Sequence, residues 1–92
     1  MKFTIGDDVV VAKGIQSVLA TVHGKSYIQN KLVQLTVSIV TSSSDISNVP
    51  MGMQVSVYHP WDSKITQRAR VQARFANSVV LLDCRPRLHL IY

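Results

Sequence analysis

Residues 19–40 read LATVHGKSYIQNKLVQLTVSIV, and this stretch decides the fold. In its second half, apolar side chains recur at every other position from Val33 to Ile39, with polar side chains between them. That period of two is typical of a half-buried strand and not of a helix. Ile15 to Val22 is a second β-rich run, and His23 to Ser26 between the two runs is a turn signal. The stretch therefore predicts a long antiparallel hairpin with a lysine and a tyrosine near its tip.

The length and the cysteine count limit the kind of protein. Ninety-two residues, 47% of them apolar, predict one domain over residues 1–92 that folds without stabilising cross-links. Cys84 is the sole cysteine, and a lone thiol fits a reducing cytoplasm better than a secreted scaffold. No run approaches the roughly 18 apolar residues that a membrane span needs. We therefore expect a cytoplasmic protein (in the host cell, if the protein is viral) with no membrane partner.

The charge balance favours an anionic partner. Ten lysines and arginines face five acids, all of them aspartate, and the net charge is +5. A positive field of this size attracts nucleic acid or an anionic surface. The absence of glutamate also argues against solvated helix faces, which normally use it.

The remaining runs also read as short strands. They are Val9–Ala12, Met53–Tyr58, Val79–Leu82 and a closing edge strand at Leu88–Tyr92, with an exposed loop at Thr41–Pro50. We see no internal repeat. Several short strands with little helix predict an all-β fold, a small barrel of five to seven strands. The barrel is expected to be OB-like, with an SH3-like barrel as the alternative.

Residues 62–75 admit two interpretations. Asp62 or Ser63 is a suitable cap for a helix starting at Lys64. Arg68 to Phe75, however, alternates between polar and apolar side chains, and a helix would scatter its arginines around the circumference. We favour a strand.

Three arginines are expected to line one side of that strand. Arg68, Arg70 and Arg74 alternate with apolar residues, and no acid on this side balances them. Alternate residues on a strand lie about 6.5–7 Å apart, and guanidinium groups bind phosphate oxygens in a bidentate way. An ordinary solvated face is the alternative. We interpret the three arginines as a nucleic-acid-binding surface.

Aromatic residues supply candidates for base stacking. Lys25 beside Tyr27 combines a cation for the backbone with a ring for a base. Tyr58 lies on the polar side of its strand, so a surface ring is favoured there. Trp61 follows a proline in a loop and either covers the barrel end or stacks on a base. Phe75 shares its side with apolar residues and is expected in the core.

The sequence offers no constellation for an enzyme. The histidines at 23, 59 and 89 lack metal-ligand spacing, and Cys84 ends an apolar strand, where a buried inert thiol is favoured. Gly24-Lys25-Ser26 lacks the earlier glycine of a phosphate-binding loop. We expect no catalytic residue, no metal, no cofactor and no small-molecule substrate.

The string Gly24-Lys25-Ser26-Tyr27-Ile28-Gln29-Asn30 resembles the DNA-binding hairpin of filamentous-phage single-stranded DNA-binding proteins of the gene V type. Leu82–Leu88 is loosely similar to the closing strand of that family, and Pro50-Met51-Gly52 is similar too. The resemblance implies an OB-like, dimeric viral protein acting in DNA replication. It assigns DNA contacts to Lys25 and Tyr27, and to basic residues near the chain end, here Arg85 and Arg87. Unlike the family, the first hairpin strand has no arginine, and the loop from Thr41 is longer than expected.

Together these observations predict a protein that binds single-stranded nucleic acid, DNA by preference, with little sequence specificity. Backbone electrostatics and base stacking would supply the affinity. A homodimer is expected, because one small barrel offers few nucleotides of groove and twofold pairing is the commonest assembly. The alternative is a small SH3-like module whose basic face docks an acidic protein.

Overall fold

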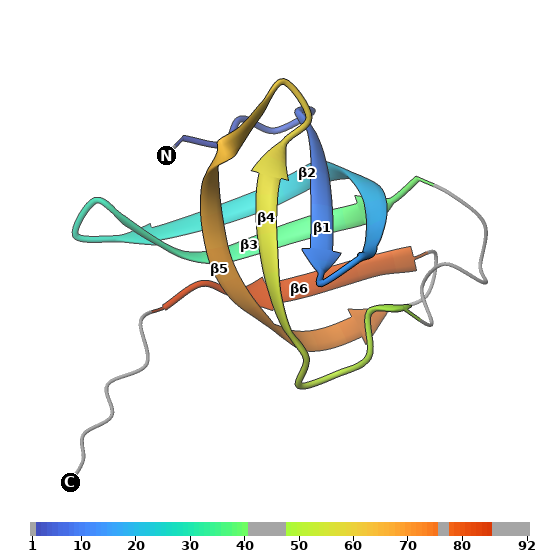
Figure 1. Cartoon of the computed structure of the whole chain (residues 1–92). Helices are drawn as coiled ribbons and strands as arrows, with labels where there is room; N and C mark the ends of the chain where they lie inside the picture. Colours follow the sequence, from blue (N-terminus) through green and yellow to red (C-terminus); the bar gives the residue numbers. More distant parts are fainter. Residues whose placement is uncertain (1, 41–47, 76–77, 86–92) are drawn as a thin grey trace, which may run out of the picture.

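The chain folds into a closed six-stranded antiparallel β-barrel (Figure 1). The computed structural model describes residues 2–40, 48–75 and 78–85. The strands are β1 (Asp8–Lys13), β2 (Gln16–Ile28), β3 (Lys31–Ile39), β4 (Gln54–His59), β5 (Asp62–Phe75) and β6 (Val79–Asp83). Within the described ranges there is no helix able to cross a membrane. The predicted all-β barrel is confirmed, and residues 62–75 form a strand.

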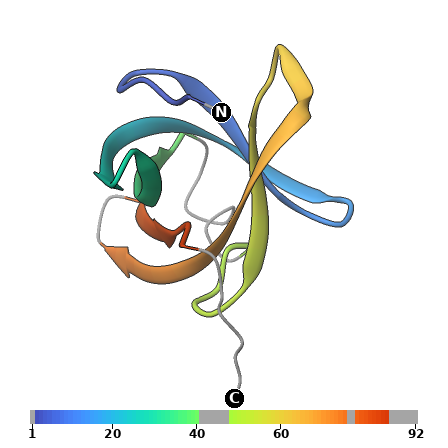
Figure 2. The same ribbon diagram turned by 90° about the vertical axis from the view of Figure 1, so that its left-hand side faces the viewer.

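The strand order around the barrel is β1-β2-β3-β6-β5-β4, and β4 pairs with β1 to close it. Each half of the chain is a three-stranded meander, β1-β2-β3 followed by β4-β5-β6, and the two meanders join along β1–β4 and β3–β6. Figure 2 shows the strands curving around a common interior. Closure gives the central part of each strand two neighbours, whereas the end of the β2–β3 hairpin is paired on one side only.

The two halves repeat the same local structure. Gly6 N donates to Val22 O and Val22 N donates to Asp7 O, both at 2.8 Å. In the second half, Gly52 N donates to Val71 O at 2.8 Å and Val71 N to Met53 O at 2.9 Å. Gly6 and Gly52 both have positive φ, 96° and 83°. The barrel is therefore an internal structural repeat, which the sequence analysis missed.

Small β-branched side chains fill the barrel. The buried cluster includes side chains from both meanders: Val9, Val11, Val22 and Val37 from the first, and Val57, Val71, Val80 and Leu82 from the second. Phe3 and Val49, which precede the equivalent glycines, are buried as well. Interior positions alternate with outward ones along each strand, as a small barrel requires. The alternation predicted for Met53–Tyr58 is confirmed, with Val55 and Val57 inside.

The long hairpin turns later than expected. The turn residues are Gln29 and Asn30, because Ile28 pairs with Lys31, and both have positive φ (52° and 65°). Positive φ at both central residues is the geometry of a type I′ turn, which matches strand twist. The expected turn at 23–26 was wrong: Gly24 pairs with Thr36 inside the ladder. Lys25 therefore lies within β2, three residues before its end.

Four register shifts interrupt the strand pairs in the described ranges, and two of them, at His23 and Gln72, are bulges that change which side chains face the core. His23 is unpaired between Val22 and Gly24, so Lys25 pairs with the buried Leu35 and lies on the inner side, at the end of the barrel. Gln72 is unpaired between Val71 and Ala73 in the same way. A bulge inserts one residue and inverts the alternation beyond it.

The second bulge overturns two predictions. Arg70 pairs with Asp83 on the outer side, whereas Arg74 pairs with the buried Val80 and lies on the inner side. The expectation that Arg74 shares a side with Arg68 and Arg70 was therefore wrong. Phe75 is directed outward and is 55% exposed, so its placement in the core was also wrong. The predicted strand at Leu88–Tyr92 and most of the loop from Thr41 lie outside the described residues.

Alanine substitutions at two glycines should change the stability of this fold in different directions. Gly52→Ala should destabilise the protein by about 1–2 kcal/mol, because φ is positive there and nothing within 4 Å would compensate. Gly24→Ala should be neutral or stabilising by up to about 1 kcal/mol, because alanine suits a strand better and its Cβ would meet Thr36 at an ordinary 3.7 Å. Thermal unfolding of both variants is the measurement. A Gly52→Ala protein as stable as the parent would contradict the assigned turn.

Candidate nucleic-acid interface

The lysine–tyrosine pair predicted from the sequence lies near the turn of the β2–β3 hairpin. Lys25 Nζ donates a 2.7 Å hydrogen bond to Phe3 O and lies 5.7 Å from the centre of the Tyr27 ring. A cation over an aromatic ring at an exposed site contributes roughly 0.5–1 kcal/mol. Tyr27 remains 41% exposed. The lysine thus holds the N-terminal segment to β2 and leaves the ring accessible.

A stack of three rings joins the N-terminal segment to the β4–β5 hairpin. The Phe3 and His59 ring centres are 4.9 Å apart, and those of His59 and Trp61 are 4.5 Å apart. Phe3 and His59 are buried, whereas Trp61 at the hairpin turn is 68% exposed. The structure therefore places Trp61 at the surface, stacked on the buried ring of His59. Because Lys25 binds Phe3 O, one chain of contacts connects both exposed rings.

Asp7 fixes the position of His59. Nε2 of His59 donates to Asp7 Oδ2 at 2.8 Å, and Thr4 N donates to the same oxygen at 3.0 Å. The backbone hydrogen bond from Thr4, and then the bond from His59, hold the pKa of Asp7 below its ordinary value of 3.8. The carboxylate therefore orients the ring on which Trp61 stacks.

A cationic cleft of about 550 Å³ occupies a different part of the surface, around β1, β4, β5 and the end of β6. Its charged lining is Lys13, Arg68, Arg70 and Arg85, with Asp83 as the one acid among the residues that line it. The rest of the lining includes amide, hydroxyl and backbone groups at Gln54, Ser56, Gln67 and Gly14. The cleft thus combines spare positive charge with hydrogen-bond donors, which is what a phosphate-bearing ligand needs.

Arg70 is the least exposed cation of the cleft. It is half-buried between Gln54 of β4 and Asp83 of β6 in the ladder. Its Nε is buried and has no hydrogen-bond partner in the structure, which is uncommon for a guanidinium nitrogen. Because this Nε is buried, the Arg70 side chain has to move before that donor can reach a ligand in the cleft.

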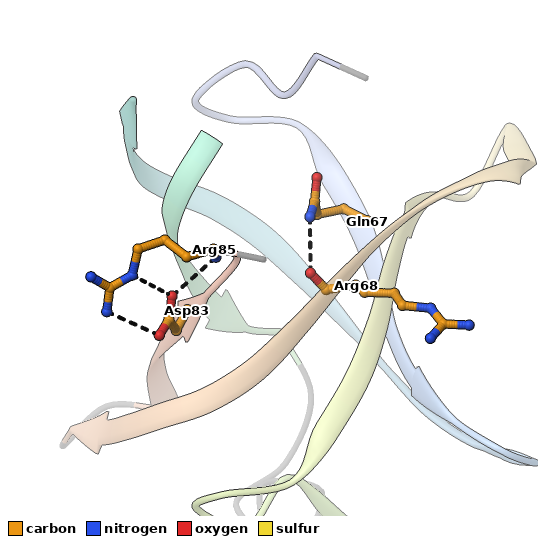
Figure 3. A network of polar contacts seen from close by, with 4 residues as sticks. All are labelled: Gln67, Arg68, Asp83 and Arg85. Carbon is orange, nitrogen blue, oxygen red and sulfur yellow. Dashed lines mark hydrogen bonds and ion pairs between the residues drawn. The ribbon is translucent and has the colours of Figure 1, made fainter. Parts of the chain in front are cut away.

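Asp83 holds Arg85 in a two-point ion pair (Figure 3). Arg85 Nε lies 3.1 Å from Asp83 Oδ1 and Nη2 lies 3.2 Å from Oδ2, while Arg85 N also donates to Oδ1. These hydrogen bonds raise the pKa of Arg85. Figure 3 shows the Arg68 guanidinium directed away from this pair, so Arg68 does not share Asp83.

The structure separates the predicted site residues into two groups. Arg68, Arg70 and Arg85 line the cleft, whereas Lys25, Tyr27 and Trp61 belong to the contacts around Phe3. Tyr58 is half-buried on the outer side beside Val10 and lines neither. Arg74 lies on the inner side, and Arg87 is outside the described residues.

Residues that sequence reasoning missed complete both groups. Lys13, the last residue of β1, adds a cation to the cleft. Phe3, Asp7 and His59 form the support of Trp61, and no sequence spacing relates them. The expected burial of Cys84 is confirmed, and desolvation raises the pKa of its thiol to about 12. In the described part of the chain, no group of three His, Cys, Asp or Glu side chains is arranged to hold a metal ion.

Comparisons with family models, with curated proteins and with solved structures find no match to this chain. The resemblance of residues 24–30 to the phage hairpin stays a prediction.

The Asp7 contact predicts a pH-dependent stability. Because the folded pKa of Asp7 is lowered, its carboxylate stabilises the fold above the ordinary pKa of 3.8, and this stabilisation is lost as the pH falls through the folded pKa. Asp7→Asn should therefore melt below the parent at neutral pH, and the difference should shrink in acid. Melting curves across the acid range test this, with Asp8→Asn at the next, exposed position as control. A difference independent of pH would contradict it.

Proposed function

We propose that this protein binds single-stranded nucleic acid, with DNA as the ligand to test first and with little sequence specificity. The observation that carries the proposal is the cleft lined by Lys13, Arg68 and Arg70, in which the one acid of the lining, Asp83, is paired with Arg85. Arginine forks in such a cleft bind phosphates of the backbone irrespective of sequence.

The internal repeat supplies a built-in comparison for the cleft. Arg70 pairs with Gln54 across β4–β5, and the equivalent pair across β1–β2 is Thr21 with Asp8. Likewise Arg68 with Ser56 corresponds to Leu19 with Val10. If the arginines served solubility alone, the equivalent face would be expected to carry cations too. It carries none at these positions, which supports a binding role for the arginine face.

Exposed rings provide the second component of binding. Trp61 and Tyr27 present accessible faces at the two hairpins, and both are held from behind, by His59 and by Lys25 respectively. Preorganised rings lose little entropy on stacking, and base–aromatic stacking contributes about 1–3 kcal/mol per base. The two groups together match backbone electrostatics combined with base stacking.

A basic docking module remains the second candidate, because the same cleft suits an acidic peptide. The two differ in their response to oligonucleotides. Stacking quenches Trp61 fluorescence, and counterion release makes the logarithm of the affinity fall linearly with the logarithm of the salt concentration. A homodimer, a viral replication role and a host cytoplasmic location stay predictions, and sedimentation measures the first of them.

Arg70 tests the electrostatic component. Arg70→Gln should reduce the magnitude of the salt slope for single-stranded oligonucleotide by about one unit, because one phosphate contact is lost. The double variant Arg70→Gln with Thr21→Arg keeps the net charge and moves the arginine to the equivalent outer position. It should bind as weakly as Arg70→Gln alone. Restored binding would show that net charge matters and the cleft does not.

Tyr27 tests the stacking component. Tyr27→Ala should weaken oligonucleotide binding about tenfold at an unchanged salt slope, since a ring and no charge is removed. Tyr27→Phe should bind like the parent. Lys25→Ala should change the slope instead. If Tyr27→Ala lowers the melting temperature by several degrees but leaves the affinity of the folded protein unchanged, the ring is structural.

A further inference from the structure

A second hollow, of about 350 Å³, adjoins the cationic cleft and shares Arg85 with it. It lies between the β2–β3 hairpin and Arg85. Its lining is Ser26, Tyr27, Ile28, Val33, Gln34 and Arg85. Small-molecule sites begin at about 300 Å³ and combine apolar walls with a few polar groups. The hollow has that size and that composition.

The Arg85 guanidinium is held flat at the edge of this hollow. The two contacts with Asp83, at 3.1 and 3.2 Å, fix the plane of the group, while 58% of the side chain remains exposed (Figure 3). The paired carboxylate offsets the charge and occupies two of the donors. Arg85 is therefore a poor phosphate ligand, but its planar face remains available for stacking.

The other walls suit a flat heterocycle with polar edges. Val33 and Ile28 supply apolar surface, and Ile28 is 60% exposed without a ligand. Ser26 and Gln34 are cross-strand partners, and their hydroxyl and amide groups offer both donors and acceptors. An amide and a hydroxyl can each donate or accept a hydrogen bond, so they can pair with the polar edge of any base.

We propose that this hollow seats one nucleobase, stacked on the Arg85 guanidinium and bonded at its edge by Gln34 and Ser26. Guanidinium planes and aromatic rings are the surfaces on which proteins stack unpaired bases. The inference rests on the function proposed above. It gives Arg85 a role different from that of Arg68 and Arg70, since Arg85 contacts a base and the other two contact the backbone.

Arg85→Lys separates the two roles, because lysine keeps the charge and loses the plane. The probes are a thymidine oligonucleotide and an abasic deoxyribose-phosphate polymer of equal length, titrated against the parent, Arg85→Lys and the control Arg68→Lys. We expect Arg85→Lys to lose about fivefold or more in affinity for the thymidine oligonucleotide and none for the abasic polymer. Arg68→Lys should change both affinities by the same factor. Gln34→Leu should behave like Arg85→Lys.

Equal losses on both probes for Arg85→Lys would show a backbone contact and overturn the base site. Unchanged binding of both probes would overturn it as well. Melting temperatures of the variants, compared with the parent, identify a loss caused by unfolding, and Gln34→Leu then decides. If the parent binds neither probe, the proposed function itself fails. If the parent binds both probes equally well, the proposed function stands and the base site fails.

Discussion

The two bulges, at His23 in β2 and at Gln72 in β5, are the constraint on which the surface of this barrel depends. Each inserts one residue into a long strand at the equivalent point of the repeat and inverts the alternation that follows. The first turns Lys25 to the inner side, where it binds Phe3 O and approaches Tyr27. The second removes Arg74 from the face of Arg70. The placement of Lys25 and Arg74 therefore follows from these two bulges, and further register shifts precede Tyr27 and His59.

Much of the fold was readable from the sequence, because alternation and turn residues determine it locally. Most strand positions and the inward side of Val55 and Val57 were predicted on that basis, whereas β2 continues to Ile28 and was expected to end at Val22. The bulges were not, since His23 and Gln72 differ in no obvious way from paired strand residues, and the errors at Arg74 and Phe75 followed. The repeat was missed because the matching features, such as Gly6 with Gly52 and Val22 with Val71, are single residues at unequal separations. The cluster of Phe3, Asp7 and His59 required the tertiary structure.

The repeat also allows the side chains on two equivalent outer faces of the barrel to be compared. Both halves use the same backbone scheme, so their outer faces start from equal geometry. One face carries Arg68 and Arg70 across from Ser56 and Gln54 of β4, and the other carries Leu19 and Thr21 across from Val10 and Asp8 of β1. The barrel closes through interior valines, and its outer positions are therefore free to differ. The charge difference between equivalent faces is a property of the side chains alone, and it supports the binding role that we propose.

The most direct test of this account is to map single-stranded oligonucleotide binding by amide chemical-shift perturbation across the described strands. The account predicts perturbations at Lys13, Ser56, Arg68, Arg70 and Arg85, and at the Tyr27 and Trp61 turns. The equivalent face at Val10, Leu19 and Thr21 should remain unperturbed. Perturbations of equal size on both faces, or confined to the Leu19 face, would contradict the central claim that one of the two equivalent faces is the binding surface.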